Sequence, residues 1–295
     1  MSSQALDGFH DIVVEVDDPV GLIRLNRPEK LNAFTYRTLA EIRSAIRALT
    51  DDARVVGIVI TGDGRGFSAG LDSQTLVDVT ASSQGNPEAV SRPADANASR
   101  DADLPGIFSY FLQVPKPIVA AINGVAAGGG LILAMMSDVR IASSAASFTT
   151  VFLKRGLIAE HGASWLLPRM VGIGRALDLL WLSDRIDAAT AREYGLVERV
   201  VAPEELLPTA YDYVRRLAVT SAPAAIAETK RLVYAHLGTG YVDALVEANA
   251  SQDRFVAAPD ALEGARALVE KRAPSFARLG GAQASDPSST NTGTQ

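Results

Sequence analysis

The sequence predicts a mixed α/β fold that ends in a purely helical region. Two runs of apolar residues, at 55–61 and 118–122, have the composition of strands that are covered on both faces. A glycine-rich stretch follows each run, and the last third of the chain shows helical periodicity only. We therefore predict an α/β core over residues 1–200, a helical C-terminal region over 201–279 and a disordered tail over 280–295.

Composition narrows the class of function. The 295-residue chain is 47% hydrophobic and 21% charged, with a formal net charge of −6, which is typical of a globular protein that does not bind nucleic acid generally. It has no cysteine, and its three histidines lack metal-ligand spacing, so we expect no metal site. The N-terminus lacks an apolar signal segment, and Asn123 and three glycines interrupt the apolar run at 117–136. We therefore expect a cytoplasmic protein without membrane spans.

The N-terminal elements are predicted in the order strand, strand, helix, strand. Residues 12–16 and 21–25 alternate on either side of Pro19, which predicts a β-hairpin. Thr35 is a suitable N-cap for the amphipathic helix that follows. The buried strand at 55–61 comes next.

The remaining elements are predicted from periodicity and turn residues. The polar stretch at 73–104 is expected to be mobile, either as a lid or as an insertion. Short strands are expected at 140–142 and 147–149, and an extended segment at 196–201. The expected helices cover residues 104–114, 162–171, 176–182, 190–194, 204–219, 222–236, 241–257 and 260–271.

Two glycine-rich stretches are the strongest functional signal. Residues 117–138 combine an apolar strand, a tight turn and the three glycines at 128–130, and residues 62–72 are also glycine-rich. A glycine-rich turn that runs into a helix leaves backbone N–H groups exposed, and these suit a negatively charged oxygen. Two such donors converging on one oxygen form an oxyanion hole. A tight turn inside a core is the alternative interpretation.

Two other motifs overlap residues 62–72. Residues 62–66 (GDGRG) resemble part of a dinucleotide-binding loop, but Phe67 stands where the last glycine is required. Residues 66–70 (GFSAG) match the nucleophile elbow of α/β-hydrolases, which must lie directly between a strand and a helix. Four residues separate Thr61 from this motif, and only His236 is late enough to complete a triad, so we disfavour both interpretations.

Taken together, four motifs resemble the crotonase superfamily, the enoyl-CoA hydratase/isomerase family. Each is weak alone, but their order and spacing over about residues 12–276 are specific. The motifs are 26–33 (NRPEKLNA), 66–72 (GFSAGLD), 115–130 (PKPIVAAINGVAAGGG) and 263–272 (EGARALVEKR). The resemblance implies a crotonase-like spiral of repeated β-β-α units, followed by helices that build homotrimers, often paired into hexamers. Apolar side chains such as Leu206, Leu207, Val214 and Leu217 are expected in that contact.

The resemblance also implies a binding site for an acyl-CoA thioester. The thioester oxygen would accept hydrogen bonds from the backbone N–H groups of Leu71 and Gly129. The residues that match the CoA-binding segments are Arg27, Lys30, Leu31, Ser68, Ala69, Gly70 and Asp72. Arg27 and Lys30 are the candidate phosphate partners, with ordinary surface charge as the alternative. Coenzyme A is part of the substrate, so no separate cofactor is expected.

The acid/base position is where the chain departs from its relatives. Family hydratases use two glutamates, and the matching positions here are Ile132 and Phe152. A third family position, which carries a carboxylate in several isomerases and a dehalogenase, aligns with Glu160. We therefore predict Glu160 as the catalytic proton shuttle, with a helix N-terminal charge as the alternative role. Trp165 is expected to serve packing.

The predicted reaction is the isomerisation of an enoyl-CoA double bond through this one carboxylate. Hydration of an enoyl-CoA, as in fatty-acid β-oxidation, is the close alternative. A non-catalytic acyl-CoA-binding protein is the second alternative. The loss of both hydratase glutamates favours it, whereas Glu160 opposes it.

Overall fold

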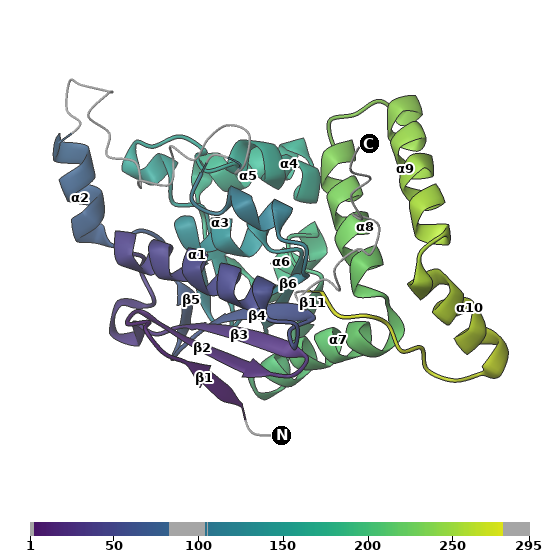
Figure 1. The fold of residues 1–295 in the computed structure, drawn as a ribbon. Coiled ribbons are helices and arrows are strands. Elements are labelled where there is room, and N and C mark those ends of the chain that lie inside the picture. The colour runs from purple at the N-terminus through teal and green to yellow at the C-terminus, as the bar shows by residue number, and fades with distance from the viewer. Residues whose placement is uncertain (1–2, 83–103, 105, 280–295) are drawn as a thin grey trace, which may run out of the picture.

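The computed structural model describes residues 3–82, 104 and 106–279 (Figure 1). Within these residues, seven strands form a larger sheet in the order β1-β2-β3-β4-β6-β8-β11, and four form a smaller sheet in the order β10-β9-β7-β5. The strands are β1 (Gln4–Leu6), β2 (Ile12–Asp17), β3 (Val20–Leu25), β4 (Gly57–Gly62), β5 (Gly66–Ser68), β6 (Ile118–Ile122), β7 (Val125–Ala127), β8 (Val139–Ser143), β9 (Ser147–Thr149), β10 (Ile186–Asp187) and β11 (Arg199–Val201). The helices are α1 (Tyr36–Asp51), α2 (Ser73–Ser82), α3 (Gly129–Met136), α4 (Ala163–Val171), α5 (Ile173–Leu182), α6 (Ala188–Tyr194), α7 (Leu206–Thr220), α8 (Pro223–His236), α9 (Tyr241–Val256) and α10 (Pro259–Glu270).

The two sheets are built by a repeating unit of two strands and a helix. β4 is followed by β5 and α2, β6 by β7 and α3, and β8 by β9 and α4. The first strand of each unit joins the larger sheet, and the second joins the smaller sheet. Within each sheet these strands pair in parallel with the strands of the neighbouring unit. This arrangement is the predicted spiral, and the mixed α/β fold is confirmed.

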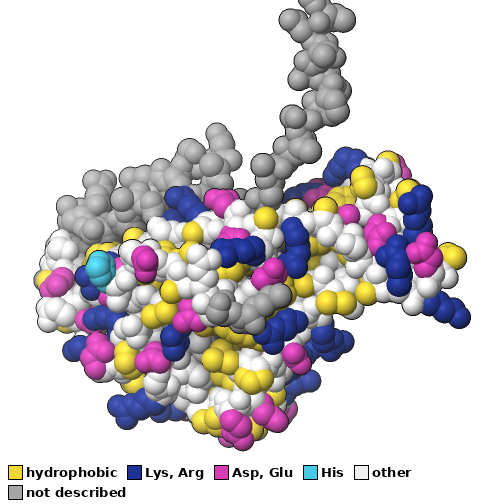
Figure 2. All heavy atoms as spheres, turned by 60° about the horizontal axis from the view of Figure 1, so that its bottom comes forward, with side chains coloured by type: hydrophobic (Ala, Val, Ile, Leu, Met, Phe, Trp, Pro, Cys, Tyr) yellow, Lys and Arg dark blue, Asp and Glu magenta, His cyan; other side chains and the backbone are white. Residues whose placement is uncertain are grey.

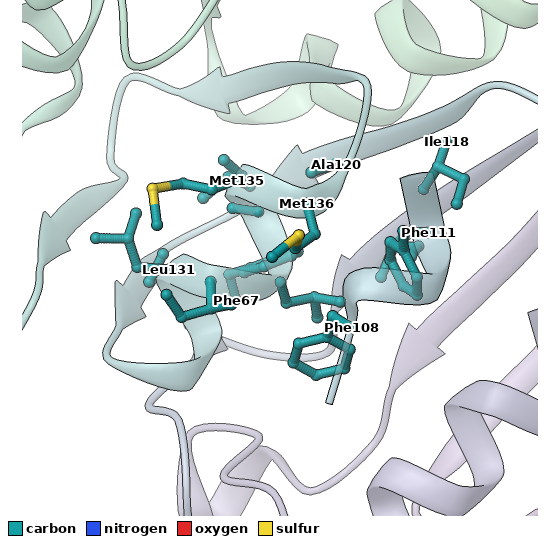
Figure 3. Packing of buried hydrophobic residues seen from close by; sticks show 14 of the residues in the cluster. Phe67, Phe108, Phe111, Ile118, Ala120, Leu131, Met135 and Met136 are labelled. Atoms are coloured by element: carbon teal, nitrogen blue, oxygen red, sulfur yellow. The ribbon is translucent and has the colours of Figure 1, made fainter. Parts of the chain in front are cut away.

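The two strands predicted from apolar runs form the centre of the larger sheet. Every residue of β4 and β6 is buried, which is the pattern expected of strands covered on both faces. α3 packs against β5 and β6 on one side of this centre. Figure 3 shows Leu131, Met135 and Met136 of α3 among buried side chains that include Phe67 of β5 and Phe108.

α1 begins as the sequence predicts. The Thr35 side chain accepts a hydrogen bond from the Thr38 backbone N–H, and the Thr38 hydroxyl accepts one from the Thr35 N–H, which closes a capping box. Asp11, which is 3% exposed, accepts hydrogen bonds from both of these hydroxyls and from Arg37. The hydrogen bonds from Arg37 and the two threonines lower the Asp11 pKa, although burial opposes that shift. The loop that contains Asp11 is thereby fastened to the start of the helix.

α7 covers the opposite face of the larger sheet. Leu206 and Val214 are 2% and 0% exposed and pack with Val59, Val119 and Ile141 of the sheet. The expectation that Leu206 and Val214 form an oligomer contact is therefore wrong, because the same chain already covers them. Amphipathic periodicity showed that α7 has an apolar face, but not which surface that face meets.

Two predicted segments differ from the structure. Residues 73–82 of the stretch expected to be mobile form α2, which buries none of its residues. Residues 83–103 of the same stretch fall outside the described residues, as does the predicted tail at 280–295. The helix expected over 104–114 is limited to a 3-10 turn at Ser109–Gln113.

The C-terminal helices α8, α9 and α10 project from the core, and a final segment returns from them (Figure 1). Near α10, Arg272 pairs with Glu263, and the Ser275 backbone N–H donates to the same carboxylate at 2.7 Å. At its far end, Arg278 donates to the Arg54 carbonyl at 3.1 Å and to Asp18 at 3.3 Å. We call residues 272–279 the return strap.

Candidate active site

Two asparagines hold the loops that surround the glycine-rich stretches. The Asn32 side chain is 1% exposed; its Nδ2 donates to Asp63 and Gly66 carbonyls, and its Oδ1 accepts from the Arg27 N–H at 2.9 Å. Asn123, in the turn between β6 and β7, also donates to the Gly66 carbonyl, at 3.2 Å. The motifs contain both residues, but sequence reasoning gave neither a role. The only sequence signal was an asparagine close to a glycine-rich turn.

The predicted CoA-binding segments come together as two paired stretches of backbone. The Ala69 N–H donates to the Leu31 carbonyl at 2.9 Å, and the Phe34 N–H donates to the Gly70 carbonyl at 2.7 Å. The Asp72 N–H then donates back to the Phe34 carbonyl at 2.9 Å. Residues 26–33 and 66–72 are thereby held side by side, although more than thirty positions separate them.

Ser68 has a structural environment rather than that of a nucleophile. Its side chain is completely buried, and its hydroxyl donates to the Asn32 carbonyl at 2.8 Å. The same oxygen accepts the Gly70 N–H at 3.1 Å. No histidine contacts it among the described residues. The serine hydrolase interpretation therefore fails on geometry.

The two candidate phosphate partners differ in how they are held. The Arg27 guanidinium donates to the Ala33 carbonyl at 2.5 Å and lies 3.5 Å from the Asp72 carboxylate, and both side chains are less than one-fifth exposed. Lys30 is exposed, and within the described part of the chain it forms no ion pair. Lys30 is therefore the more accessible charge for an anionic ligand, and Arg27 ties the two paired stretches together.

The backbones of Leu71 and Gly129 lie next to each other. A Cβ placed on Gly129 would stand 3.6 Å from the Leu71 nitrogen and 3.4 Å from the Gly70 Cα. A Cβ on Gly70, whose φ is +85°, would stand 2.7 Å from the Gly129 nitrogen, so only glycine fits there. Gly129 is the first residue of α3, where backbone N–H groups have no helical acceptor. Across residues 3–82 and 106–279, neither the Leu71 nor the Gly129 N–H has an acceptor.

The positions that carry glutamates in family hydratases are buried and apolar here. Ile132 and Phe152 are 0% and 3% exposed and belong to the main hydrophobic core. Both positions therefore hold hydrocarbon side chains and offer no carboxylate to activate a water molecule.

Glu160 lies in the loop that leads into α4, at some distance along the chain from the glycine turns. Its carboxylate is 3.5 Å from His161 Nε2, and its side chain is 38% exposed. His161 and Gly162 both have positive φ, and a Cβ on Gly162 would meet the end of the Met136 side chain at 2.8 Å. The Glu160 loop therefore contacts the C-terminal end of α3, whereas the Gly129 N–H lies at its N-terminal end. In the described residues, no hydrogen bond joins Glu160 to Leu71 or Gly129.

A cavity of about 1010 Å³ opens between the core and α8. Met136, Gly162 and Trp165 form its wall on the core side, and Trp165 stacks with Arg169 at 4.2 Å. Its other walls contain mainly apolar side chains such as Leu112 and Phe255. Neither Leu71 nor Gly129 is among the described residues that line it.

Comparison with known proteins identifies the family. The sequence profile of the enoyl-CoA hydratase/isomerase family matches residues 15–278. The chain belongs to this family of enzymes. It is 34% identical to a probable enoyl-CoA hydratase of Mycobacterium bovis, with 93% of this chain and 97% of the relative covered. It is also 34% identical to the 1,2-epoxyphenylacetyl-CoA isomerase of Escherichia coli, with 90% and 97% covered.

Solved structures agree with this membership. A crystal structure of an enoyl-CoA hydratase from Bacillus anthracis superposes with a TM-score of 0.81 at 28% identity, covering 92% of this chain and all of that chain. A hydratase subunit from Geobacillus kaustophilus gives a TM-score of 0.78 at 32% identity, covering 91% and 98%. The crotonase fold expected from the four motifs is confirmed.

The structure also bears on membranes and metals. None of the helices in the described part of the chain combines the length and the apolarity that a bilayer span requires. The same residues contain no group of three or more His, Asp and Glu side chains placed to hold a metal ion. The predicted cytoplasmic location and the predicted absence of a cofactor stay predictions.

Proposed function

We propose that the protein acts on acyl-CoA thioesters and that the Leu71 and Gly129 N–H groups bind the thioester oxygen. The observation that carries this proposal is the adjacency of these two backbone donors, both without an acceptor in the described structure. An enolate formed next to a thioester places negative charge on that oxygen. Two fixed donors stabilise this charge, and loss of one such donor typically costs about 10²–10³ in rate. Family membership and the names of the relatives support the substrate class.

The reaction we propose is the shift of an enoyl-CoA double bond. A base removes a proton from the carbon between the thioester carbonyl and the double bond, which gives a conjugated dienolate. The same group then returns the proton further along the chain, so no water enters the product. A buried isoleucine and a buried phenylalanine stand at 132 and 152, and this favours a reaction with one carboxylate over activation of water by two.

Glu160 is the carboxylate to which we assign this proton transfer. The resemblance to family isomerases described above supports the assignment, as do the partial exposure of its side chain and its contact with His161. For transfer to occur, the Glu160 carboxylate must reach the carbon next to the thioester carbonyl while the thioester oxygen is bound by the Leu71 and Gly129 N–H groups. The Glu160 loop contacts α3 at the Met136 side chain.

A small panel of CoA thioesters tests the reaction class. A 3-enoyl-CoA that is converted to the conjugated 2-enoyl-CoA identifies an isomerase, and loss of a 2-enoyl-CoA to its 3-hydroxy product identifies a hydratase. Binding without turnover on every thioester would instead identify a non-catalytic acyl-CoA-binding protein. The conjugated and the hydrated products are distinguished by ultraviolet absorbance and mass.

Glu160→Gln tests the proton shuttle. The amide keeps the shape and hydrogen bonding of the carboxylate but cannot take a proton, so isomerase turnover should fall by about 10²–10⁴. Binding of acyl-CoA should stay close to that of the native protein. Glu204→Gln, at an exposed glutamate near the start of α7, is the matched control and should keep full activity. Full activity in Glu160→Gln would reject the assignment and direct attention to His161.

We further propose that copies of the chain associate through the projecting helices α8, α9 and α10, as homotrimers or as hexamers built from two trimers. Leu268 and Val269 of α10 are 80% and 82% exposed, and Val242 of α9 is 70% exposed. Figure 2 shows hydrophobic side chains among charged ones on this projecting part of the molecule, at the right. Apolar side chains gathered on projecting helices favour contact with a second protein surface.

A further inference from the structure

Val151 has a backbone conformation that its side chain disfavours. Its φ is +53°, in the left-handed region, and it is the one β-branched residue with positive φ among the described residues. Branching at Cβ makes this region costly for valine, whereas glycine and asparagine enter it readily. A valine held in this way contributes something through its side chain that glycine would not provide.

The Val151 side chain lies on the turn that presents the Gly129 N–H. Its Cγ2 stands 3.1 Å from the point that a Cβ on Gly128 would occupy. Gly128 is the N-cap of α3, with φ +50° and ψ −118°, and it immediately precedes Gly129. The Gly128 N–H also donates to the Thr149 carbonyl at 3.1 Å. Gly128, the residue directly before the Gly129 N–H, therefore meets the segment that contains Val151 at both its N–H and its Cα.

Buried hydroxyl groups fix the residues that precede Val151. The Thr149 hydroxyl donates to the Ser183 carbonyl at 2.9 Å, and the Thr150 hydroxyl donates to the Leu179 carbonyl at 2.8 Å. Thr150 and Ser183 are 2% and 3% exposed, and their hydroxyl oxygens are 2.9 Å apart. These contacts attach the segment to the C-terminal end of α5. A rigid attachment on this side keeps Val151 in its strained conformation.

We propose that Val151 is a positioning residue for the Gly129 N–H. Its methyl group packs on Gly128 and sets the direction of the next peptide, so that the N–H points to the position of the thioester oxygen. This inference rests on the proposed function of the Leu71 and Gly129 donors. A displacement of about 1 Å in such a group can cost about 10²-fold in rate, so loss of the methyl groups should lower kcat by at least about 10-fold.

Val151→Gly separates this role from a merely structural one. Glycine removes the backbone strain together with the methyl groups, so thermal stability should stay close to native while kcat falls and KM changes little. Val151→Ile keeps a branched side chain on Gly128 and should restore most of kcat. Lys271→Gly is the matched control, because Lys271 has φ +54° at the exposed C-cap of α10. It relieves similar strain and should leave kcat unchanged.

A spectroscopic measurement tests whether the Gly129 N–H stabilises an enolate, and it does not require turnover. A 3-oxoacyl-CoA forms an enolate that absorbs in the near ultraviolet, and donors aimed at its thioester oxygen raise the bound enolate fraction. We expect the native protein to show this band and Val151→Gly to show it at least about 10-fold weaker, with similar total binding. An equal band in the two proteins would overturn the role of Val151 alone. Binding of the 3-oxoacyl-CoA without a band in the native protein would overturn the oxyanion site and, with it, this inference.

Discussion

At the scale of single residues, Asn32 shows how much of the site depends on one buried amide. Its side chain bonds the Arg27 N–H of its own loop and the Asp63 and Gly66 carbonyls at the turn between β4 and β5. Its own φ of 55° is one that asparagine tolerates better than most residues. Without Asn32, the Arg27 N–H and the Asp63 carbonyl would lose these partners, and the Gly66 carbonyl would keep only Asn123 of its two asparagine donors. Asn32 therefore connects the Arg27 loop to the turn that ends in β5.

Asn32→Ala should destabilise the fold and weaken ligand binding together. The change leaves buried carbonyls at Asp63 and Gly66 with fewer donors, and each unsatisfied group of this kind costs about 1–3 kcal/mol. Urea denaturation should show a lower free energy of unfolding, and titration with CoA should show weaker binding. Asn26→Ala changes an exposed asparagine of the same loop and should have little effect on either measurement. Equal stability in the two variants would contradict the role of Asn32.

Gly129→Pro tests one backbone donor directly. Proline suits the first position of a helix and lacks an N–H, so it removes the proposed donor at a position where the helix needs none. Turnover should fall by at least about 10². Tyr241→Pro makes the same change at the first residue of α9, where the side chain is 79% exposed, and should leave turnover intact. An active Gly129→Pro variant would remove Gly129 from the oxyanion site.

At the scale of elements, the helices and strands that could be predicted from the sequence were the longer ones with buried apolar residues. β4 and β6 were predictable because continuous apolar runs indicate strands covered on both faces. β5, β7 and β10 have two or three residues each, which is too short for any period to appear, whereas the short strand predicted at 147–149 is confirmed as β9. α2 escaped prediction because it buries none of its residues and thus needs no apolar face.

The sequence predicted the paired stretches of the site better than it predicted the location of Glu160. The paired stretches around Asn32 and Gly70 meet through backbone hydrogen bonds, and both stretches were found as sequence motifs. The location of Glu160 depends instead on loop conformation, on two positive φ angles and on the contact with Met136. No periodicity in a sequence encodes such a loop.

α8 and α9 are joined by a charged cluster that responds to pH. Glu228 of α8 accepts hydrogen bonds from Arg231, from Ser251 at 2.5 Å and from Arg254 at 3.2 Å. Its side chain is 18% exposed, and the hydrogen bonds from Arg231 and Ser251 lower its pKa to about 2. Because the folded-state pKa is below the ordinary value of 4.5, this group stabilises the fold fully above about pH 4.5. That stabilisation is lost as the pH falls from about 4.5 toward 2.

Glu228→Gln should therefore be less stable than the native protein near neutral pH, and the difference should shrink in acid. Urea denaturation at about pH 7 and at about pH 3 measures this change in the difference between the two free energies of unfolding. Glu204→Gln alters an exposed glutamate, so its difference from the native protein in free energy of unfolding should be the same at both pH values. A difference that is the same at both pH values would mean that the charge of Glu228 does not stabilise the pairing of α8 and α9.

At the scale of the whole molecule, the projecting helices predict association between copies. Val269→Glu places a charge on the most exposed apolar part of α10 and should lower the molar mass measured by light scattering. Val77→Glu makes the same change at a 59% exposed valine on α2 and should leave the mass unchanged. If Val77→Glu lowered the molar mass and Val269→Glu did not, the contact between copies would lie near α2 and not on the projecting helices.

The return strap has a consequence for how the chain folds. Its Arg278 contacts Asp18, which lies 260 positions earlier in the sequence, in the turn between β2 and β3. Contacts of such long sequence separation form late, because a large loop must close before they contribute. During synthesis the N-terminal hairpin emerges long before its C-terminal partner exists. We therefore expect the surface around Asp18 and Arg54 to acquire its final neighbours only after the last helix has docked, which makes strap closure a late step in folding.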